Sequence, residues 1–554
     1  QHQREMGLTK NLRHRKLYQR YSDKFQRFYK LRPRSRLRVG SSLQRALTSF
    51  ALLLTLSPGT VFAGTINVDG TICSLADAIT AANTDNATGG CPAGSGADTL
   101  ILHPNSTISL DSVDNWTEEG GSNGLPVVDS EITIEGNGVH IMRSEADDAP
   151  EFRIFSVSNG GDLTINHATM SGGVAVDDGD GILFGNEASG GGLINLGVTV
   201  LNRCEIVGNM AELGGGGLYN EGTMTLLYST IRGNISDDNG GGVVNNNNGQ
   251  SPARLAIGNS LVSQNSAKGL IGNGFGGGVQ NQNGEVRISD STIYDNTAKT
   301  GGGVSSFDDL IVEKSVVFGN TAFSRGGGVQ SSGSLVIYNS TISKNVITDT
   351  GIGFGREGGG IYINGGIATI SNSSIVGNRA INFSGGILNR STLILNRSLI
   401  SGNISPSSAE INGTSTNSYN LIGHNGITNA EAFGGGFFPG ATDIVATADG
   451  TNPTPLEHIV DTTLQNNGGP TETHALVLGS PAIDAALGCP PPDKDQRGVM
   501  RPQGIACDIG AFELQPELAR IVHIDIKPGN RENVINPRSK GGIWVAILSD
   551  TGPG

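Results

Sequence analysis

Short stretches of alternating apolar and polar residues recur along the middle of the chain, each closed by the same turn. The segment 228–234 (YSTIRGN) has relatives at 290–296, 339–345, 372–378 and 397–403. An aliphatic residue stands three positions before each closing asparagine, and a serine stands five positions before it. Because residues two apart share one face of a strand, both positions are expected to face the same narrow interior.

The closing asparagines repeat at about 25 residues, and three of the repeats are lengthened by insertions. They are Asn209, Asn234, Asn265, Asn296, Asn320, Asn345, Asn378 and Asn403. A Gly-Gly-apolar step follows the first seven of them, and no helical periodicity separates the strands. A β-propeller blade needs about 40 residues, and a leucine-rich repeat needs leucine at most core positions. The pattern therefore predicts an all-β fold, a single-stranded right-handed parallel β-helix of about ten to twelve coils.

In such a coil every residue lies about 4.8 Å from its equivalent in the next coil. The repeated asparagines are therefore expected to form a buried ladder, in which each side-chain amide bonds the next one. The glycine steps would supply the positive φ angles of the corners. Cys204 stands where the later repeats have serine, so a buried, unreactive thiol is predicted there.

Both ends of a β-helix expose strand edges and need covering. The segment 73–83 (CSLADAITAAN) is the best helix after residue 63, with Ser74 as its expected N-cap and an apolar face formed by Leu75, Ala78, Ile79 and Ala82. We expect this helix to lie over the first coil as an N-terminal cap.

Charge is divided sharply along the chain. Residues 1–45 contain 14 Lys/Arg and two acids, which leaves 23 Lys/Arg against 49 Asp/Glu after residue 45, a net charge of −26 there. The basic arm ends at Arg45 and meets the apolar run 46–56. Val61 and Ala63 then occupy the −3 and −1 positions of a signal-peptidase site. An apolar run of 11 residues is too short for a bilayer, which needs about 20. Export is predicted, and no nucleic-acid partner is expected because the basic arm would be removed.

Cysteine usage fits an oxidising destination. Cys73 and Cys91 are 18 residues apart, as are Cys489 and Cys507, with one pair on each side of the repeats. Two local disulfides are predicted, Cys73 with Cys91 and Cys489 with Cys507. The spacing does not match a CxxC zinc or redox site, so no metal site is assigned.

Three stretches resemble known families. The segment 73–79 (CSLADAI), followed by Cys91, resembles the CSLREA-type motif of secreted bacterial β-helix proteins, with Ala-Asp in place of Arg-Glu. The coils are similar to chlamydial polymorphic outer-membrane proteins and to pectate-lyase-like rods. The stretch 464–513, which includes LQNNGGPT, GSPAID, DQRG and CDIGAFE, resembles the choice-of-anchor Q domain. These resemblances imply a secreted or surface-held protein, and they supply no common catalytic residues.

The predicted organisation follows from these boundaries. Residues 1–63 form a basic extension with a signal peptide, 64–130 a CSLREA-like N-terminal cap, and 131–430 the β-helix. Residues 431–514 form a choice-of-anchor Q-like C-terminal cap. Residues 521–554 look like the beginning of a small β module, and any membrane anchor is expected beyond Gly554.

No catalytic residue is assigned. The acidic stretch 177–181 (DDGDG) resembles part of a calcium loop but lacks the later ligands and the bidentate Glu, so calcium is only a weak expectation and no cofactor is assigned. A solvated insertion is favoured there, as it is for 237–238 and 308–309. Ser480, His474 and Asp484 suggest a hydrolase triad, but the serine is not in a nucleophile elbow. His424 lacks the paired aspartates of a polygalacturonase-like site.

Two functions of different class remain. The first is an exported, cell-surface-associated, non-catalytic rod that acts in adhesion or envelope structure. Its expected partners are extracellular polysaccharide or a neighbouring cell surface. The alternative is a secreted polysaccharide lyase or glycoside hydrolase on the same fold. Either activity is expected in the insertions at 268–276 and 349–358, because lengthened loops are the irregular surface of a regular rod.

Overall fold

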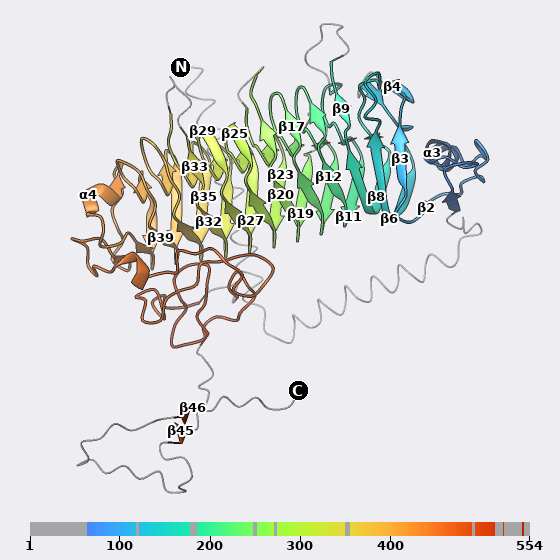
Figure 1. Ribbon diagram of the computed structural model, residues 1–554. Helices are drawn as coiled ribbons and strands as arrows, with labels where there is room; N and C mark the ends of the chain where they lie inside the picture. Colours follow the sequence, from blue (N-terminus) through green and yellow to red (C-terminus); the bar gives the residue numbers. More distant parts are fainter. Residues whose placement is uncertain are drawn as a thin grey trace, which may run out of the picture. The chain divides into compact units, whose positions relative to one another are not determined.

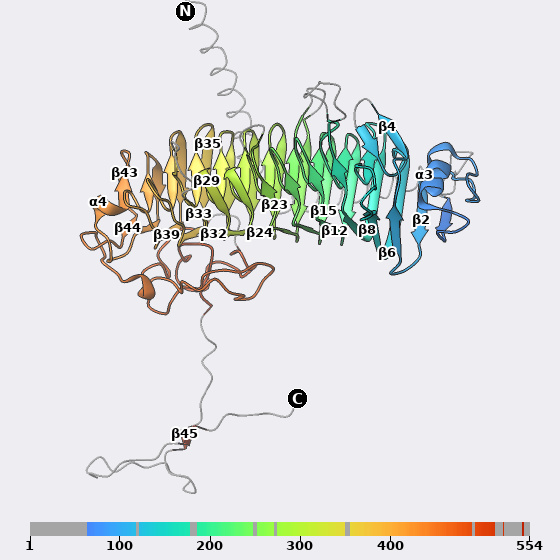
Figure 2. The ribbon, with the colours of Figure 1, turned by 45° about the horizontal axis from the view of Figure 1, so that its top comes forward.

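A computed structural model describes residues 64–117, 121–177, 186–247, 252–270, 274–348, 355–489 and 494–515, together with two short strands further on. Within these residues the chain winds into a parallel β-helix whose coils stack side by side (Figures 1 and 2). The stacked strands form parallel sheets of 24, 11 and 7 strands. The predicted fold class is confirmed. The 11-stranded sheet takes one strand from each of 11 coils, but each of the two rows of strands in the 24-stranded sheet contains 13 strands, so the described stack is slightly longer than the predicted ten to twelve coils.

One coil shows how the repeat unit folds. It begins with β14 (Leu218–Asn220), continues through β15 (Thr223–Leu227) and β16 (Thr230–Arg232), and ends with β17 (Ile235–Ser236). Strand β14 belongs to the 11-stranded sheet, β15 and β16 to the 24-stranded sheet, and β17 to the 7-stranded sheet. The connection from the 7-stranded sheet to the next coil varies in length, as does the connection after the 11-stranded sheet, which is longest between β18 and β19.

The 24-stranded sheet contains two rows of strands. The first row is β1 (Thr65–Val68), β2 (Asp98–Leu102), β6 (Glu131–Arg143), β8 (Asp162–Ser171), β11 (Val198–Asn202), β15, β19 (Arg254–Gly258), β23 (Glu285–Ser289), β27 (Asp309–Glu313), β31 (Leu335–Tyr338), β35 (Ile367–Ser371), β38 (Thr392–Asn396) and β41 (Thr416–Ser418). Strands β6 and β8 continue into the second row, which also holds β3 (Thr107–Leu110), β12 (Glu205–Val207), β16, β20 (Leu261–Ser263), β24 (Thr292–Tyr294), β28 (Val316–Phe318), β32 (Thr341–Ser343), β36 (Ser374–Val376), β39 (Leu399–Ser401), β42 (Leu421–Ile422) and β44 (Ile444–Val445).

The two smaller sheets complete each coil. The 11-stranded sheet is β7 (Phe155–Val157), β10 (Leu193–Asn195), β14, β18 (Val243–Asn245), β22 (Val279–Asn281), β26 (Val304–Ser306), β30 (Val329–Ser331), β34 (Ile361–Ile363), β37 (Ile387–Asn389), β40 (Ile411–Asn412) and β43 (Phe433–Gly434). The 7-stranded sheet is β9 (Val174–Ala175), β13 (Met210–Ala211), β17, β21 (Ser266–Ala267), β25 (Thr297–Thr300), β29 (Thr321–Arg325) and β33 (Val346–Ile347). A hairpin of β4 (Asn115–Thr117) and β5 (Gly121–Asn123) lies outside these sheets.

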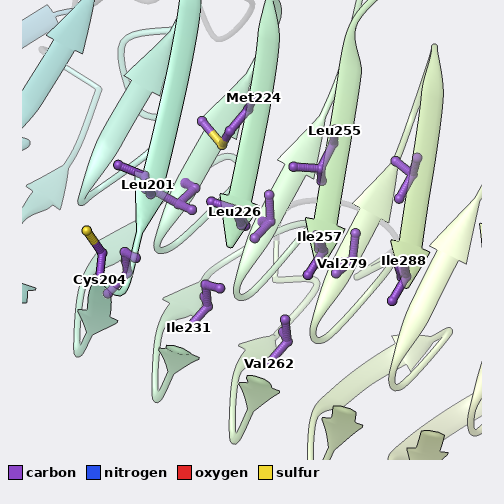
Figure 3. Close-up of a cluster of buried hydrophobic side chains, with 14 of the residues drawn as sticks. Leu201, Cys204, Met224, Leu226, Ile231, Leu255, Ile257, Val262, Val279 and Ile288 are labelled. Carbon is purple, nitrogen blue, oxygen red and sulfur yellow. The ribbon is translucent and has the colours of Figure 1, made fainter. Parts of the chain in front are cut away.

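The core consists of rows of aliphatic side chains stacked from coil to coil. Ile231 pairs in register with Ile206 before it and Val262 after it, and all three are fully buried. Figure 3 shows Ile231 and Val262 in one row, and the pairs Met224–Leu226 and Leu255–Ile257 in neighbouring coils. Each buried aliphatic side chain of this kind contributes about 1.5–3 kcal/mol relative to an exposed one.

Glycine is required where the coils turn toward the 11-stranded sheet. Gly215 has a φ of 61°, which an L side chain rarely adopts. A Cβ atom on Gly216 would lie 2.3 Å from the Ile235 carbonyl oxygen and 2.5 Å from that of Gly241 in the next coil. The conformation and the close approach of neighbouring backbones therefore both exclude larger residues.

The stack begins earlier in the chain than the predicted boundary at residue 131. Strand β1 pairs with β2, and β2 pairs with β6, so both of these early strands already belong to the parallel sheet. The helix α3 (Leu75–Thr84) is inserted between β1 and β2, with Ser74 as its N-cap, and buries the expected apolar face of Leu75, Ala78, Ile79 and Ala82. The boundary was missed because these first strands are separated by the helix and by a loop, which hides the repeat.

The C-terminal segment does not cover the open end of the stack, where the prediction placed it. Residues 455–489, which include the 3-10 helix η1 (Leu456–His458), and residues 494–515 pack along the flank of the last coils, against the outer side of β32, β36 and β39 (Figures 1 and 2). The coils continue to β44, and the short helix α4 (Asn429–Ala432) lies at the end itself.

The outer side chains of the flank explain this docking. The outward positions of the second row are charged in β12 and β16, at Glu205 and Arg232, but small or apolar in later coils, at Ser374 and Leu399. A flank of small and apolar side chains would form an exposed apolar patch, and the C-terminal segment buries it.

Most of the predicted module at 521–554 lies outside the described residues. Only β45 (Ile524–Asp525) and β46 (Ala546–Ile547) are described there, and they pair antiparallel. The predicted signal peptide at 1–63 lies wholly outside the described residues.

Candidate functional site

The eight repeated asparagines lie in one continuous buried ladder. From Asn209 to Asn403, each Nδ2 donates to the Oδ1 of the next asparagine at 2.9–3.1 Å. Each Oδ1 that accepts such a bond also accepts the backbone N–H of the preceding asparagine, as Asn345 does for Asn320 at 3.1 Å. Each amide thus satisfies backbone groups at a turn as well as its neighbour, which gives these residues a structural role.

A carboxyl group ends this ladder. Asn403 Nδ2 donates to Glu410 Oε2 at 2.6 Å, and the Gly402 N–H donates to Oε1 at 3.0 Å. Glu410 is fully buried, and burial raises its pKa to about 8. All ladder amides point their N–H groups toward this end, so an acceptor is needed there, and Glu410 supplies it.

A second ladder was not predicted. Asn195, Asn220 and Asn245 each donate from Nδ2 to the Oδ1 of the next, at 2.7, 2.7 and 2.9 Å, and the row ends at Asn281. Asn281 then donates to Ser306 Oγ at 3.0 Å. The signal was present, because each of these asparagines follows the apolar residue of a Gly-Gly step by two positions.

The serine positions form a third row. Their hydroxyl oxygens accept the backbone N–H of the equivalent residue one coil earlier, beginning with Cys204 N–H to Ser229 Oγ at 3.0 Å. Cys204 itself is buried and is not in a disulfide. Burial raises the pKa of its thiol to about 11, so the thiol is structural, as predicted.

Both predicted disulfides are confirmed. Cys73 bonds Cys91 beside α3, and Cys489 bonds Cys507 in the C-terminal segment. Disulfides of this kind are typical of oxidising compartments. No helix within the described residues is both long and apolar enough to cross a membrane.

The structure does not assemble the triad-like residues. His474 accepts from Ser343 Oγ through Nε2 at 2.7 Å and donates from Nδ1 to the Asp461 carbonyl at 2.9 Å, so it joins the C-terminal segment to the coils. Ser343 and His474 are both buried, and burial lowers the pKa of His474 to about 4. Asp484 instead accepts the Ala506 N–H.

The other candidate residues from the sequence do not come together in a site either. His424 accepts the Gly426 N–H through Nδ1, and burial lowers its pKa. Residues 178–181 of the calcium-like stretch lie outside the described residues, and the Asp177 N–H donates to Glu212. The pairs 237–238 and 308–309 are in different parts of the coil, since 237–238 follows β17 and 308–309 lies at the start of β27. Among the described residues, no three His, Cys, Asp or Glu side chains are grouped to hold a metal ion.

Two lengthened connections, at 268–278 and 348–360, leave the 7-stranded sheet and enter the 11-stranded sheet, so they lie along one edge of the stack, whereas the lengthened connection 246–253 leaves β18 of the 11-stranded sheet and enters β19 of the 24-stranded sheet. The predicted insertions at 268–276 and 349–358 are both here, although residues 271–273 and 349–354 are outside the described part. We call this edge the loop edge and define it by the described connections 268–270, 274–278, 323–328, 355–360 and 380–386. Two of the three insertions in the repeats thus lie on this one edge.

An arginine cluster lies where the loop edge meets the outer face of the 11-stranded sheet. Arg390 Nη2 lies 2.6 Å from Glu357 Oε2, and Arg325 Nε lies 4.0 Å from the same oxygen. Both guanidinium carbons stand over the Tyr362 ring, at 5.5 and 5.7 Å from its centroid. Tyr362 is 2% exposed, whereas the two arginine side chains are 38% and 47% exposed. We call these four residues the Arg–Tyr cluster.

Coil register brings the Arg–Tyr cluster together. Arg325 forms a parallel bridge with Glu357, which stands one coil later. Tyr362 is in β34, and Arg390 follows β37, the neighbouring strand of the same sheet. The ring and the buried carboxylate hold the two guanidinium groups in place, so their positive charge faces solvent in a fixed position.

Aromatic side chains extend the same edge. Phe275 and Phe307 meet edge to face with ring centroids 4.8 Å apart, and Phe307 is 37% exposed. Phe383, which forms a bridge with Glu357, is 44% exposed. Exposed aromatic rings beside arginine are typical of binding surfaces.

Comparison with known proteins yielded one solved structure. No family model matches the chain, and no curated protein matches it in sequence. The crystal structure of the pectate lyase Pel9A aligns with a TM-score of 0.38 and 14% identity, covering 80% of this chain and 91% of that one.

Proposed function

We propose that the protein is an exported, cell-surface-associated and non-catalytic β-helix rod that binds acidic polysaccharide along its loop edge. The Arg–Tyr cluster carries this proposal. Two guanidinium groups with one shared carboxylate form a local positive site on a chain whose residues after 45 have a net charge of −26. Carboxylate and sulfate groups of glycans are the anions that such a fork of N–H donors fits.

The surroundings of the cluster favour binding over turnover. A lyase or hydrolase needs carboxylates free to hold calcium or to exchange a proton. Glu357 is occupied by two arginines instead, and its side chain is only 10% exposed. The strongly shifted groups Glu410 and His474 are buried in contacts that hold the coils together.

The proposed surface location rests on the predicted signal peptide and on the two disulfides. We propose adhesion because one edge of a long regular stack offers contacts to several segments of an extended glycan at once. Repeated weak contacts along one ligand raise the overall affinity without a deep pocket.

The test is a binding and turnover panel with pectate, alginate, glycosaminoglycans and a neutral glucan, each with and without Ca²⁺. The proposal expects binding of the acidic polymers that weakens with salt. The double variant Arg325→Ala/Arg390→Ala should lose affinity by about tenfold or more, since each charge-assisted hydrogen bond contributes about 1.5–3 kcal/mol. Glu357→Gln should bind more tightly, because it removes the competing carboxylate.

The matched control is Arg232→Ala/Arg287→Ala. It removes two exposed, ion-paired arginines from the 24-stranded sheet and changes net charge equally. Equal losses in both double variants would refute the proposed site. Release of new reducing ends or unsaturated products would show that the protein is an enzyme.

A further inference from the structure

Asp98, at the start of β2, is a buried carboxyl group that lacks a cationic partner. It is 1% exposed, and its Oδ1 accepts the Ser95 N–H at 2.8 Å. Within the described residues, its Oδ2 accepts no hydrogen bond, and no lysine, arginine or histidine forms an ion pair with it. Asp85, the other charged group that acts on this carboxyl, has the same sign. A buried carboxylate in this position is costly unless a positive charge reaches it.

Gly64 lies directly beside this carboxyl group. Thr65 pairs with Thr99 in the sheet, which places the preceding residue Gly64 next to Asp98. The Thr99 N–H donates to the Gly64 carbonyl at 2.8 Å, and the Gly64 N–H points to the Ser95 carbonyl at 3.3 Å. A Cβ atom on Gly64 would lie 2.2 Å from Asp98 Oδ1. The backbone nitrogen of Gly64 is therefore held near the carboxyl, and no side chain fits between them.

Burial raises the pKa of Asp98, and the backbone N–H groups of Ser95 and Gly64 oppose that rise. The Gly64 nitrogen directs its single hydrogen to the Ser95 carbonyl. As an amide it offers one hydrogen and no charge, whereas an ammonium group at the same atom offers three hydrogens and a positive charge.

The sequence places a cleavage site at this atom. Val61 and Ala63 fit the −3 and −1 positions of signal peptidase, so the residue after the cut is Gly64. Hydrolysis adds one water across the Ala63–Gly64 bond, which leaves a carboxylate on Ala63 and an α-ammonium group on Gly64.

We propose that this cleavage creates an N-terminal ammonium group at Gly64 that forms a buried ion pair with Asp98 and fixes β1 in the first coil. The proposal rests on the export part of the proposed function, and it makes removal of the leader a step that completes the fold at its N-terminal end. It also explains why the residue after the cleavage site is glycine, which has no Cβ atom to collide with Asp98.

The test cuts the same chain in vitro. Residues 58–63 of the full chain are replaced by the recognition sequence of a protease that cleaves directly before glycine, so that cut and uncut protein differ only at this bond. Cutting should raise the midpoint of thermal unfolding of the N-terminal coils and protect the β1 amides from hydrogen exchange. Asp98→Asn should abolish both effects, whereas the matched control Asp85→Asn should retain them.

The α-amino pKa gives a second readout that does not depend on stability. Its value, from the pH dependence of N-terminal acylation, should lie at least about one unit above the ordinary 7.7–8.0, and Asp98→Asn should return it to that range. An ordinary α-amino pKa, or no effect of cutting, would overturn the proposal, as would an exported protein that begins at another residue. Failure to bind acidic glycans would refute the proposed function alone, since the cut-dependent shift needs no glycan.

Discussion

Removal of one asparagine from the middle of the long ladder tests how the coils are held together. Asn320 donates from Nδ2 to Asn345 Oδ1 at 2.9 Å and to the Ile293 carbonyl at 3.0 Å. Its Oδ1 accepts both the backbone N–H and the side-chain amide of Asn296, at 3.0 and 2.9 Å. All of these atoms are buried among neighbouring coils, where water cannot replace the lost bonds.

The expected cost follows from the groups left behind. Asn320→Ala leaves the Asn296 backbone N–H and the Ile293 carbonyl without these partners. An unsatisfied buried group costs about 1–3 kcal/mol, so the two together cost about 2–6 kcal/mol. At about 1.4 kcal/mol per factor of ten, amide protection in the adjacent coils should fall by about 30-fold to 10⁴-fold.

Hydrogen exchange read by mass spectrometry is the appropriate assay, because a long stack of repeats need not unfold in a single step. Peptides covering 290–325 should lose protection, while those at 131–171 should not. The control is Asn283→Ala, an exposed asparagine whose loss should cost less than about 0.5 kcal/mol. If Asn320→Ala exchanges like Asn283→Ala, the ladder does not hold the coils and the reasoning is wrong.

Three further predictions follow from buried titratable groups. The folded-state pKa of Glu410 is raised to about 8, so its stabilising contribution is complete below the ordinary value of 4.5 and is lost as pH rises toward 8. Glu410→Gln should therefore flatten the curve of melting temperature against pH between these two values. An unchanged curve would contradict this prediction. The folded-state pKa of His474 is lowered to about 4, so its stabilising contribution is complete above pH 6.5 and is lost as pH falls toward 4. Limited proteolysis should therefore release residues 455–515 from the coils sooner near pH 4 than at pH 7. In His474→Gln this release should depend less on pH. The Cys204 thiol should resist alkylation at pH 8 in native protein and react after unfolding, and Cys204→Ser should cost less than about 1.5 kcal/mol in the free energy of unfolding, because serine fills this position in later coils.

Local repetition explains why most of the fold could be predicted from the sequence. The spacing of Asn234 and Ile231 in successive repeats reports strand register directly, since each coil packs against a near copy of itself. The disulfides and the N-cap at Ser74 are equally local. Each of these features joins residues whose distance along the chain is short or repeats.

Contacts between non-repeated parts could not be predicted in the same way. Packing of the C-terminal segment depends on the outer positions of distant coils, such as Ser343 with His474, which are 131 residues apart. The Arg–Tyr cluster was missed because Arg325, Glu357 and Arg390 stand in three different coils, and an insertion separates the first two. The outward-facing positions of successive repeats, aligned in the same way as the inward-facing ones, indicate both the docking flank and the Arg–Tyr cluster.

A ligand footprint on the wild-type protein tests most directly that the loop edge of this β-helix binds acidic polysaccharide. Hydrogen exchange is compared with and without a saturating acidic glycan, on peptides covering 322–331, 355–364 and 380–391. We expect slower exchange in these peptides and no change in 223–232, on the 24-stranded sheet. Protection of 223–232 with unchanged exchange at the loop edge would contradict the central claim.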